Sequence, residues 1–315
     1  MNGFASGLRS LAIKQKNSSL VAAGELLLAA NIWGFGFIAT VWALEGMGPL
    51  WMSSLRFLLA GFLALPLLIF YPSLRSEFTL ANFRMIFLPG LFLSLTLVLQ
   101  TWGLRYTSAT KSGFITTLYV AFVPVVEWLF FSKGMTILQG ICVAVALGGM
   151  ALIAGPQDFG AINTGDLLTL LCALAAACHI ISVGRFASRM KSALLFNTFQ
   201  SLWAGILPLG LAILIESPPM NALALKPLSG FLYLTIFSTL FAFMLQIRAQ
   251  KFLSPALASM IFLLESPFAA VYAYLLLGER LGWLQWAGAF VILIAVSLST
   301  MEESKKHRAA LPHYI

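Results

Sequence analysis

Ionisable side chains inside long apolar stretches are the residues of this sequence best placed to do chemistry. Arg56 and Glu265 each lie within such a stretch. A charge there is costly, so it usually faces protein or a water-filled cavity and binds a substrate, an ion or a proton. Arg56 would bind a carboxylate through its planar guanidinium, and Glu265 would bind an ammonium group or a proton. The structural alternatives are a clamp on loop carbonyls or on a partner acid for Arg56, and a protonated cap on the kink at Pro267 for Glu265.

Two further ionisable side chains are candidates for carrying a proton. Imidazole titrates near neutral pH, which suits His179 to proton transfer, although a lone histidine in a helix more often hydrogen-bonds to a neighbouring helix. Glu127 ends a polar stripe whose spacing places its members near one face of a helix, with Ser112, Thr116 and Tyr119. Glu127 would either carry a proton or pair with an arginine or lysine inside the protein. The candidates for proton coupling are therefore Glu127, His179 and Glu265.

Neutral side chains complete the candidate binding site. Gln100 and Gln246 each lie in an apolar stretch, where an amide either binds a ligand or hydrogen-bonds to a neighbouring helix. Aromatic residues in such stretches would form the walls of a cavity, although any one of them more often packs against protein or lipid. The candidate substrate-binding side chains are Trp33, Phe37, Arg56, Gln100, Tyr119, His179, Phe243, Gln246 and Glu265, with Trp102 as a further aromatic wall.

Helices that cross a membrane must position these side chains. The chain has 60% hydrophobic and 10% charged residues, whereas soluble proteins carry about 25% charged residues. About 20 apolar residues span the hydrocarbon core as a helix, which satisfies its own backbone hydrogen bonds. The apolar pattern predicts an all-α membrane protein with ten transmembrane helices, at residues 20–44, 50–70, 83–103, 108–131, 135–154, 164–187, 193–215, 228–248, 254–277 and 282–301.

The charged residues lie almost entirely in the loops and tails, so the net charge of +8 does not indicate a nucleic-acid partner. If the N-terminus is cytoplasmic, 14 Lys and Arg residues fall on the cytoplasmic side and 4 on the other side. Because positive residues gather in cytoplasmic loops, both termini are predicted to be cytoplasmic. Residues 1–19 and 302–315 are the predicted cytoplasmic tails.

The sequence has none of the usual patterns of a nucleotide or metal site. GxxxxGK[ST] and HExxH are both absent. The cysteines, Cys142, Cys172 and Cys178, lack metal-ligand spacing and are predicted to be small buried side chains. The acids inside the spans are dispersed rather than clustered at one interface. We therefore expect no cofactor, no metal and no enzymatic activity, and an ATP-driven pump is not favoured.

The chain contains an internal repeat. Residues 99–152 align with residues 245–298 at an offset of 146. The two predicted halves, residues 20–154 and 164–301, have five spans each. Halves with an odd number of spans must have opposite orientations, and inverted repeats of this kind are typical of transporters with a substrate site near the middle of the membrane. Glu25 and Asp166 open the first span of each half, and acids are favoured at helix starts.

Several short motifs are typical of one family. They are Trp33-Gly34, Arg56-Phe57, Leu99–Ala109 (LQTWGLRYTSA), Gly113-Phe114-Ile115, Leu118–Pro124, Leu264–Pro267 and Leu275–Leu281. Through them, residues 20–300 resemble the EamA family of the drug/metabolite transporter superfamily. The resemblance implies a ten-helix carrier with both ends in the cytoplasm, in agreement with the positive charges. Members of that family move amino acids, other metabolites, nucleosides and drugs, often outward.

The leading hypothesis is a secondary transporter that moves a small polar or amphipathic metabolite across the membrane by alternating access. An amino acid or a related compound is favoured, because Arg56, Glu265 and the aromatic residues together suit a zwitterion, and export is the expected direction. The expected partners are a small-molecule substrate and membrane lipid, with the protein a monomer or homodimer in the cell (inner) membrane if it is bacterial. The alternatives are a lipid flippase or a non-catalytic membrane subunit, and facilitated diffusion or exchange instead of proton coupling.

Overall fold

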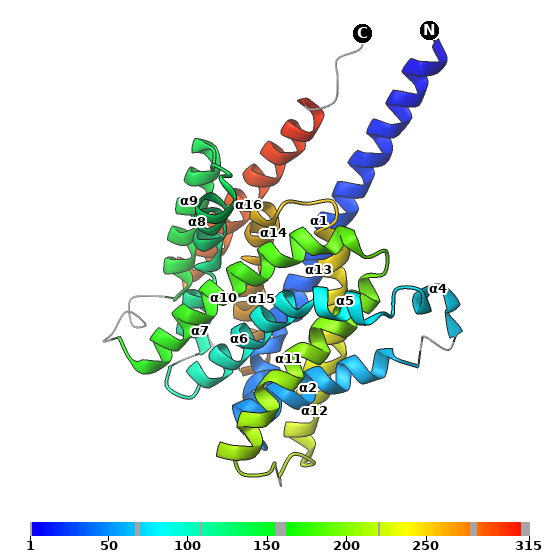
Figure 1. Cartoon of the computed structure of the whole chain (residues 1–315). Helices are drawn as coiled ribbons and strands as arrows, with labels where there is room; N and C mark the ends of the chain where they lie inside the picture. Colours follow the sequence, from blue (N-terminus) through cyan, green and yellow to red (C-terminus); the bar gives the residue numbers. More distant parts are fainter. Residues whose placement is uncertain are drawn as a thin grey trace.

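The computed structural model describes residues 2–66, 70–107, 109–154, 162–219, 221–277 and 282–309, and their regular elements are helices (Figure 1). In the first half these are α1 (Asn2–Leu44), α2 (Pro49–Ala64), α4 (Pro72–Arg75), α5 (Leu80–Met85), α6 (Phe87–Gly103), α7 (Ala109–Thr116), α8 (Tyr119–Phe131) and α9 (Ile137–Ala154). In the second half they are α10 (Thr164–Phe186), η2 (Ala187–Arg189), α11 (Ala193–Ile215), α12 (Leu225–Tyr233), the π-helix η3 (Leu234–Ala242), α13 (Phe243–Ala249), α14 (Pro255–Phe262), α15 (Glu265–Leu277) and α16 (Trp283–Ala309).

Many of these helices have the length and the apolar composition of membrane-spanning segments. Within the described ranges, 7 helical segments are long and apolar enough to cross a bilayer. Three shorter apolar helices, Pro49–Ala64, Phe87–Gly103 and Ile137–Leu152, lie where the second, third and fifth spans were predicted. Residues 67–69 of the second predicted span lie outside the described residues. Helix α1 begins and α16 ends at the same end of the bundle (Figure 1).

The first and last helices are longer than the predicted spans. Helix α1 begins at Asn2 and α16 continues to Ala309, so both include residues assigned to the predicted tails. Glu25 therefore lies within a helix rather than at its start, and the prediction of a helix-start role was wrong for this residue. It forms an ion pair with Arg248 instead. Asp166 does act at a helix start, in a capping box with Asn163.

The fourth and ninth predicted spans are each broken into two helices, whereas the only irregularity predicted in them was a kink at Pro267. Helices α7 and α8 are separated at residues 117–118, and α14 and α15 at residues 263–264. Displaced by 146 residues, the offset of the sequence repeat, the bounds of α7 and α8 coincide with those of α14 and α15. At the second break Pro267 has no N–H for the carbonyl of Leu263, which instead accepts from Ser266 in a tighter turn.

Helices α2 and α11, from different halves of the chain, pack directly against each other. Ser54 Oγ donates to the carbonyl oxygen of Gly205 at 2.7 Å. A Cβ atom at Gly205 would lie 2.8 Å from the backbone nitrogen of Leu58 and 2.9 Å from the carbonyl oxygen of Ser54. Backbone atoms cannot rotate away as a side chain can, so this approach requires glycine.

Gly205→Ala is expected to force α2 and α11 apart and to destabilise the fold by about 1–3 kcal/mol, the usual cost of overpacking. Gly210→Ala is a matched control on the same helix, because a Cβ there meets nothing within 4 Å. Thermal unfolding of the two purified variants measures the difference. Equal melting temperatures would contradict the close packing described here.

Two glutamates cap helices of the opposite half. The Glu216 carboxylate, after α11, accepts hydrogen bonds from the backbone N–H groups of Leu50 (3.0 Å) and Trp51 (3.0 Å) at the start of α2. The Glu77 carboxylate accepts from Lys191 (2.7 Å) and Ser192 (2.9 Å) at the start of α11. Free N–H groups and the helix dipole both favour an anion at these ends. The α2–α11 pair is thus held by an acid at each end.

Candidate substrate cavity

The nine side chains predicted to bind a substrate line a single cavity of about 100 Å³ inside the bundle. They come from helices α1, α2, α6, α8, α10, α13 and α15. These side chains are Trp33, Phe37, Arg56, Gln100, Tyr119, His179, Phe243, Gln246 and Glu265. Trp102 is not among the lining residues. Both halves of the chain therefore contribute polar and apolar side chains to one chamber.

The lining also includes the polar residues Thr40 and Ser238, which were not predicted from the sequence. Thr40 follows Trp33 by two helical turns, and this spacing is a signal that indicates a shared face. Ser238 lies in the π-helix η3, which is rare and often occurs at functional sites. A π-helix has a wider turn, which changes the residues that share a face. The usual helical spacing of apolar residues therefore does not reveal it.

Arg56 is buried, with 2% of its surface exposed, and it holds two hydroxyl groups of the π-helix. Its Nε donates to Thr239 Oγ1 at 2.9 Å and its Nη2 to Ser238 Oγ at 3.3 Å. No carboxylate lies within ion-pair distance of Arg56 in the described part of the chain. The expected clamp therefore exists, but on hydroxyl groups rather than on loop carbonyls or an acid. The positive charge remains available to an anion.

The π-helix is supported by side chains from two other helices. Trp33 Nε1 donates to the carbonyl oxygen of Ser238 at 3.1 Å. Asn197 Nδ2 donates to the carbonyl oxygens of Thr239 and Leu240, both at 3.0 Å. These bonds satisfy backbone carbonyls beside the wide turn, since a buried unpaired carbonyl would be costly. The position of the hydroxyl groups that contact Arg56 is therefore well defined.

His179 is connected to the π-helix through two amides. Its Nε2 lies 3.3 Å from Gln200 Oε1, an oxygen that can only accept, so the imidazole nitrogen donates. Gln200 Nε2 donates to Asn197 Oδ1 at 2.9 Å. His179 also packs edge-on against Phe243, with ring centroids 5.8 Å apart. The histidine thus makes the interhelical hydrogen bond expected of it and lines the cavity as well.

Tyr119 and Glu265 are the first residues of the second helices of the two broken spans. They occupy equivalent positions in the repeat, and both line the cavity. Glu265 is 7% exposed and lies at a helix N-terminus, where the dipole favours a negative charge. The Tyr119 hydroxyl is buried without a hydrogen-bond partner in the described structure. A ligand group in the cavity would satisfy it.

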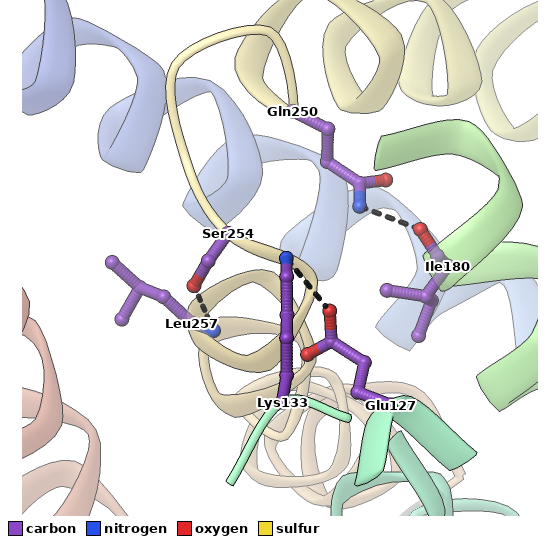
Figure 2. Close-up of polar contacts among 6 residues, drawn as sticks. All are labelled: Glu127, Lys133, Ile180, Gln250, Ser254 and Leu257. Carbon is purple, nitrogen blue, oxygen red and sulfur yellow. Dashed lines mark hydrogen bonds and ion pairs between the residues drawn. The ribbon is translucent and has the colours of Figure 1, made fainter. Parts of the chain in front are cut away.

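Gln246 also presents an unsatisfied atom. Its Nε2 donates to Gln250 Oε1 at 2.8 Å. Gln250 Nε2 in turn donates to the carbonyl oxygen of Ile180 at 2.9 Å, a bond that Figure 2 marks. The Gln246 Oε1 is buried without a donor among the described residues. Gln100, its repeat equivalent, donates to Thr116 Oγ1 at 3.3 Å. A buried unsatisfied acceptor is costly, so the cavity suits a ligand that carries a donor.

Aromatic rings form the apolar wall of the cavity. The Trp33 ring lies 5.0 Å from the ring of Phe243 and 5.0 Å from that of Phe262, measured between centroids. All three residues line the cavity. Tilted and edge-on contacts of this kind are favourable for aromatic pairs and hold the rings in place.

Glu127 lies apart from this cavity. It follows Tyr119 by two helical turns, about 12 Å along α8, and it lines a second cavity of about 180 Å³ with Val120, Ser254 and Met260. Its Oε1 is paired with Lys133 Nζ at 3.4 Å, as Figure 2 shows. Of the three candidates for proton coupling, only His179 and Glu265 line the central cavity.

Comparison with known proteins identifies the family. The family model described as the EamA-like transporter family matches residues 21–155 and again residues 163–301. The chain belongs to the EamA-like transporter family. This EamA protein is 31% identical to an uncharacterized transporter of Archaeoglobus fulgidus over 88% of its own length and 84% of the relative. It is 28% identical to an uncharacterized inner membrane transporter of Escherichia coli, YedA, over 88% and 90% of the two chains.

The fold of the EamA protein also occurs among solved structures. A protein crystal structure matches with a TM-score of 0.73 and 14% identity, over 89% of this chain and 96% of that chain. At this identity the likeness shows a shared fold alone. The family and its apolar helices show that the EamA protein is an integral, multi-pass membrane protein, and its relatives are named as transporters. The described residues contain no group of three or more His, Cys, Asp or Glu side chains placed to hold a metal.

Proposed function

We propose that this EamA protein is a secondary transporter that exports an amino acid or a related small zwitterion by alternating access. One observation carries the proposal. Arg56 and Glu265 are buried side chains from different halves of the chain that line the same cavity, yet no ion pair joins them in the described structure. A substrate carboxylate would pair with the arginine and a substrate ammonium group with the glutamate.

The rest of the cavity supports a small ligand with polar ends and an apolar body. Tyr119 and Gln246 have unsatisfied polar atoms, and Trp33 and Phe243 provide an apolar wall. The volume is about 100 Å³. At about 10–15 Å³ for each water-sized group, it holds roughly seven to ten such groups, the size of a small amino acid.

Alternating access is supported by the symmetry of helix contacts. We propose that the ten predicted spans form two inverted five-helix repeats with both ends in the cytoplasm. The breaks in the fourth and ninth spans fall at equivalent positions, and Glu77 and Glu216 cap α11 and α2 in a reciprocal manner. Rocking of one half against the other would expose the cavity first to one side of the membrane and then to the other. The excess of positive residues in predicted cytoplasmic loops orients the protein.

Proton coupling, if transport uses it, is assigned to the central cavity, where Glu265 and His179 lie. Glu127→Gln is accordingly expected to change transport rates by less than about fivefold, since an ion pair with an exposed partner contributes about 1 kcal/mol or less. Lys133, its partner, has a side chain that is 63% exposed. Uptake measured with and without a pH gradient tests this. Loss of the pH response in this variant would indicate that the proton-coupling residue lies in the second cavity.

The direct test of the proposed function uses sealed proteoliposomes that contain the purified chain. Labelled amino acids and nucleosides are offered separately, with and without an imposed pH gradient. Saturable uptake of amino acids, absent from protein-free vesicles, supports the proposal. Uptake of nucleosides alone would indicate that nucleosides, rather than amino acids, are the substrate class. Translocation of a fluorescent lipid, without uptake of amino acids or nucleosides, would favour a flippase.

A further inference from the structure

A groove is lined by residues of α1 and by residues at and just after the end of α13, and none of them lines the central cavity. Its volume is about 360 Å³, and its lining consists of Ser18, Val21, Ala22, Glu25, Arg248, Lys251 and Phe252. The candidate span of α1 begins at Ser18, and the span that ends in α13 reaches Ala249. The groove therefore lies at the level where the apolar core of a membrane meets the lipid headgroups.

Two cationic side chains in the groove keep hydrogen-bond donors available. Arg248 Nη2 pairs with Glu25 Oε1 at 2.6 Å, and the arginine side chain is 54% exposed. A guanidinium has five N–H donors, so one bond leaves others available. Lys251 Nζ donates to the carbonyl oxygens of Met190 and Lys191, both at 2.8 Å, which uses two of its three hydrogens.

The charges around the groove favour an added anion. Burial lowers the pKa of Lys251, Glu77 raises it and Arg248 lowers it, so the two cations are close enough to repel each other. The Glu77 carboxylate is already occupied by the N–H groups of Lys191 and Ser192. The lining contains one acidic side chain, Glu25, and two cationic side chains, Arg248 and Lys251. An anion between Arg248 and Lys251 would reduce their repulsion.

The same groove exposes apolar side chains. Val21 is 59% exposed and Phe252 is 50% exposed. A ligand with both an anionic headgroup and hydrocarbon chains would cover these side chains and pair with the cations at once. A soluble anion would satisfy the cations only.

We propose that this groove binds an anionic phospholipid, with its phosphate on Arg248 and Lys251 and its acyl chains against Val21 and Phe252. Basic residues between helices at the cytoplasmic surface of a membrane are suited to such headgroups. The site shares no lining residue with the central cavity, so it does not depend on the proposed transport function.

The test measures lipid binding to the purified full chain by native mass spectrometry. The probes are phosphatidylglycerol, phosphatidylcholine and soluble glycerol phosphate. Arg248→Gln is expected to weaken phosphatidylglycerol binding about fivefold, the effect of one cation near an anionic membrane surface. Glu25→Gln removes the opposing acid and is expected to strengthen binding by a similar factor. Lys226→Gln is the matched control, because it removes a cation from another ion pair, with Glu45, outside the groove.

Opposite effects of Arg248→Gln and Glu25→Gln, with no effect of Lys226→Gln, support the site. Equal binding of phosphatidylcholine and phosphatidylglycerol would overturn it, and so would binding of glycerol phosphate as strong as that of the lipid. Melting temperatures without lipid show whether each variant folds. If Arg248→Gln does not fold, the Glu25→Gln result decides, since a purely structural ion pair predicts no gain in lipid affinity.

Discussion

Glu265→Gln is expected to lower amino acid uptake by about 100-fold, the loss of roughly 3 kcal/mol that follows removal of one partner from a desolvated charge pair. The amide has nearly the same shape as the carboxylate, and Glu265 has no ion-pair partner in the described structure that the change would leave unpaired. The fold should therefore be retained. Initial rates in proteoliposomes, with melting temperature as the control for folding, measure the effect.

Two further measurements separate the possible roles of Glu265. A carboxylate that binds the substrate ammonium is required for exchange of labelled for unlabelled substrate as well as for net uptake. A carboxylate that only carries the coupling proton is required for accumulation driven by a pH gradient, but exchange continues without it. Retained exchange in Glu265→Gln would thus remove the ammonium-binding role, and unchanged uptake and exchange would remove both.

Arg56→Gln is expected to lower uptake of carboxylate substrates by about 100-fold for the same reason. Arg56→Lys keeps the charge but not the planar fork, so we expect an intermediate loss. The decisive readout is selectivity between an amino acid and its amide. The wild type should prefer the carboxylate, and Arg56→Gln should lose that preference.

A structural role of Arg56 would give a different result. The guanidinium also holds Thr239 and Ser238 of the π-helix. If that were its whole contribution, Arg56→Gln would lower the melting temperature and reduce transport of the acid and the amide equally. A preserved preference for the carboxylate in the residual activity would contradict the proposed binding role.

Local sequence pattern was sufficient for the class of protein and for the charged side chains of the cavity. A polar or charged side chain within an apolar span is costly in contact with lipid, so it must face protein or a cavity. Arg56, His179 and Glu265 were predicted as cavity residues on this ground, and all three line one chamber in the structure. The family motifs were likewise visible in the sequence, and the family is confirmed.

Hydropathy failed where the helix itself is irregular. The breaks at residues 117–118 and 263–264 and the π-helix at Leu234–Ala242 contain apolar residues that look helical in sequence. The average hydropathy of such a segment is the same whether its backbone hydrogen bonds form an α-helix, a tighter turn or a π-helix. Tyr119 and Glu127 lie on one regular helix, α8, and their spacing along it did not show that Glu127 lines a different cavity.

The sequence by itself determined that this is a multi-pass membrane transporter of the EamA family and which polar residues avoid lipid. Only the tertiary structure decided their partners. Arg56 contacts Thr239 across 183 residues of sequence, and Glu216 caps α2 across 166. Such pairs depend on how separate helices pack. The sequence pattern is set by the free energy of transferring each segment into the membrane. That free energy carries no information about which other segment will be its neighbour.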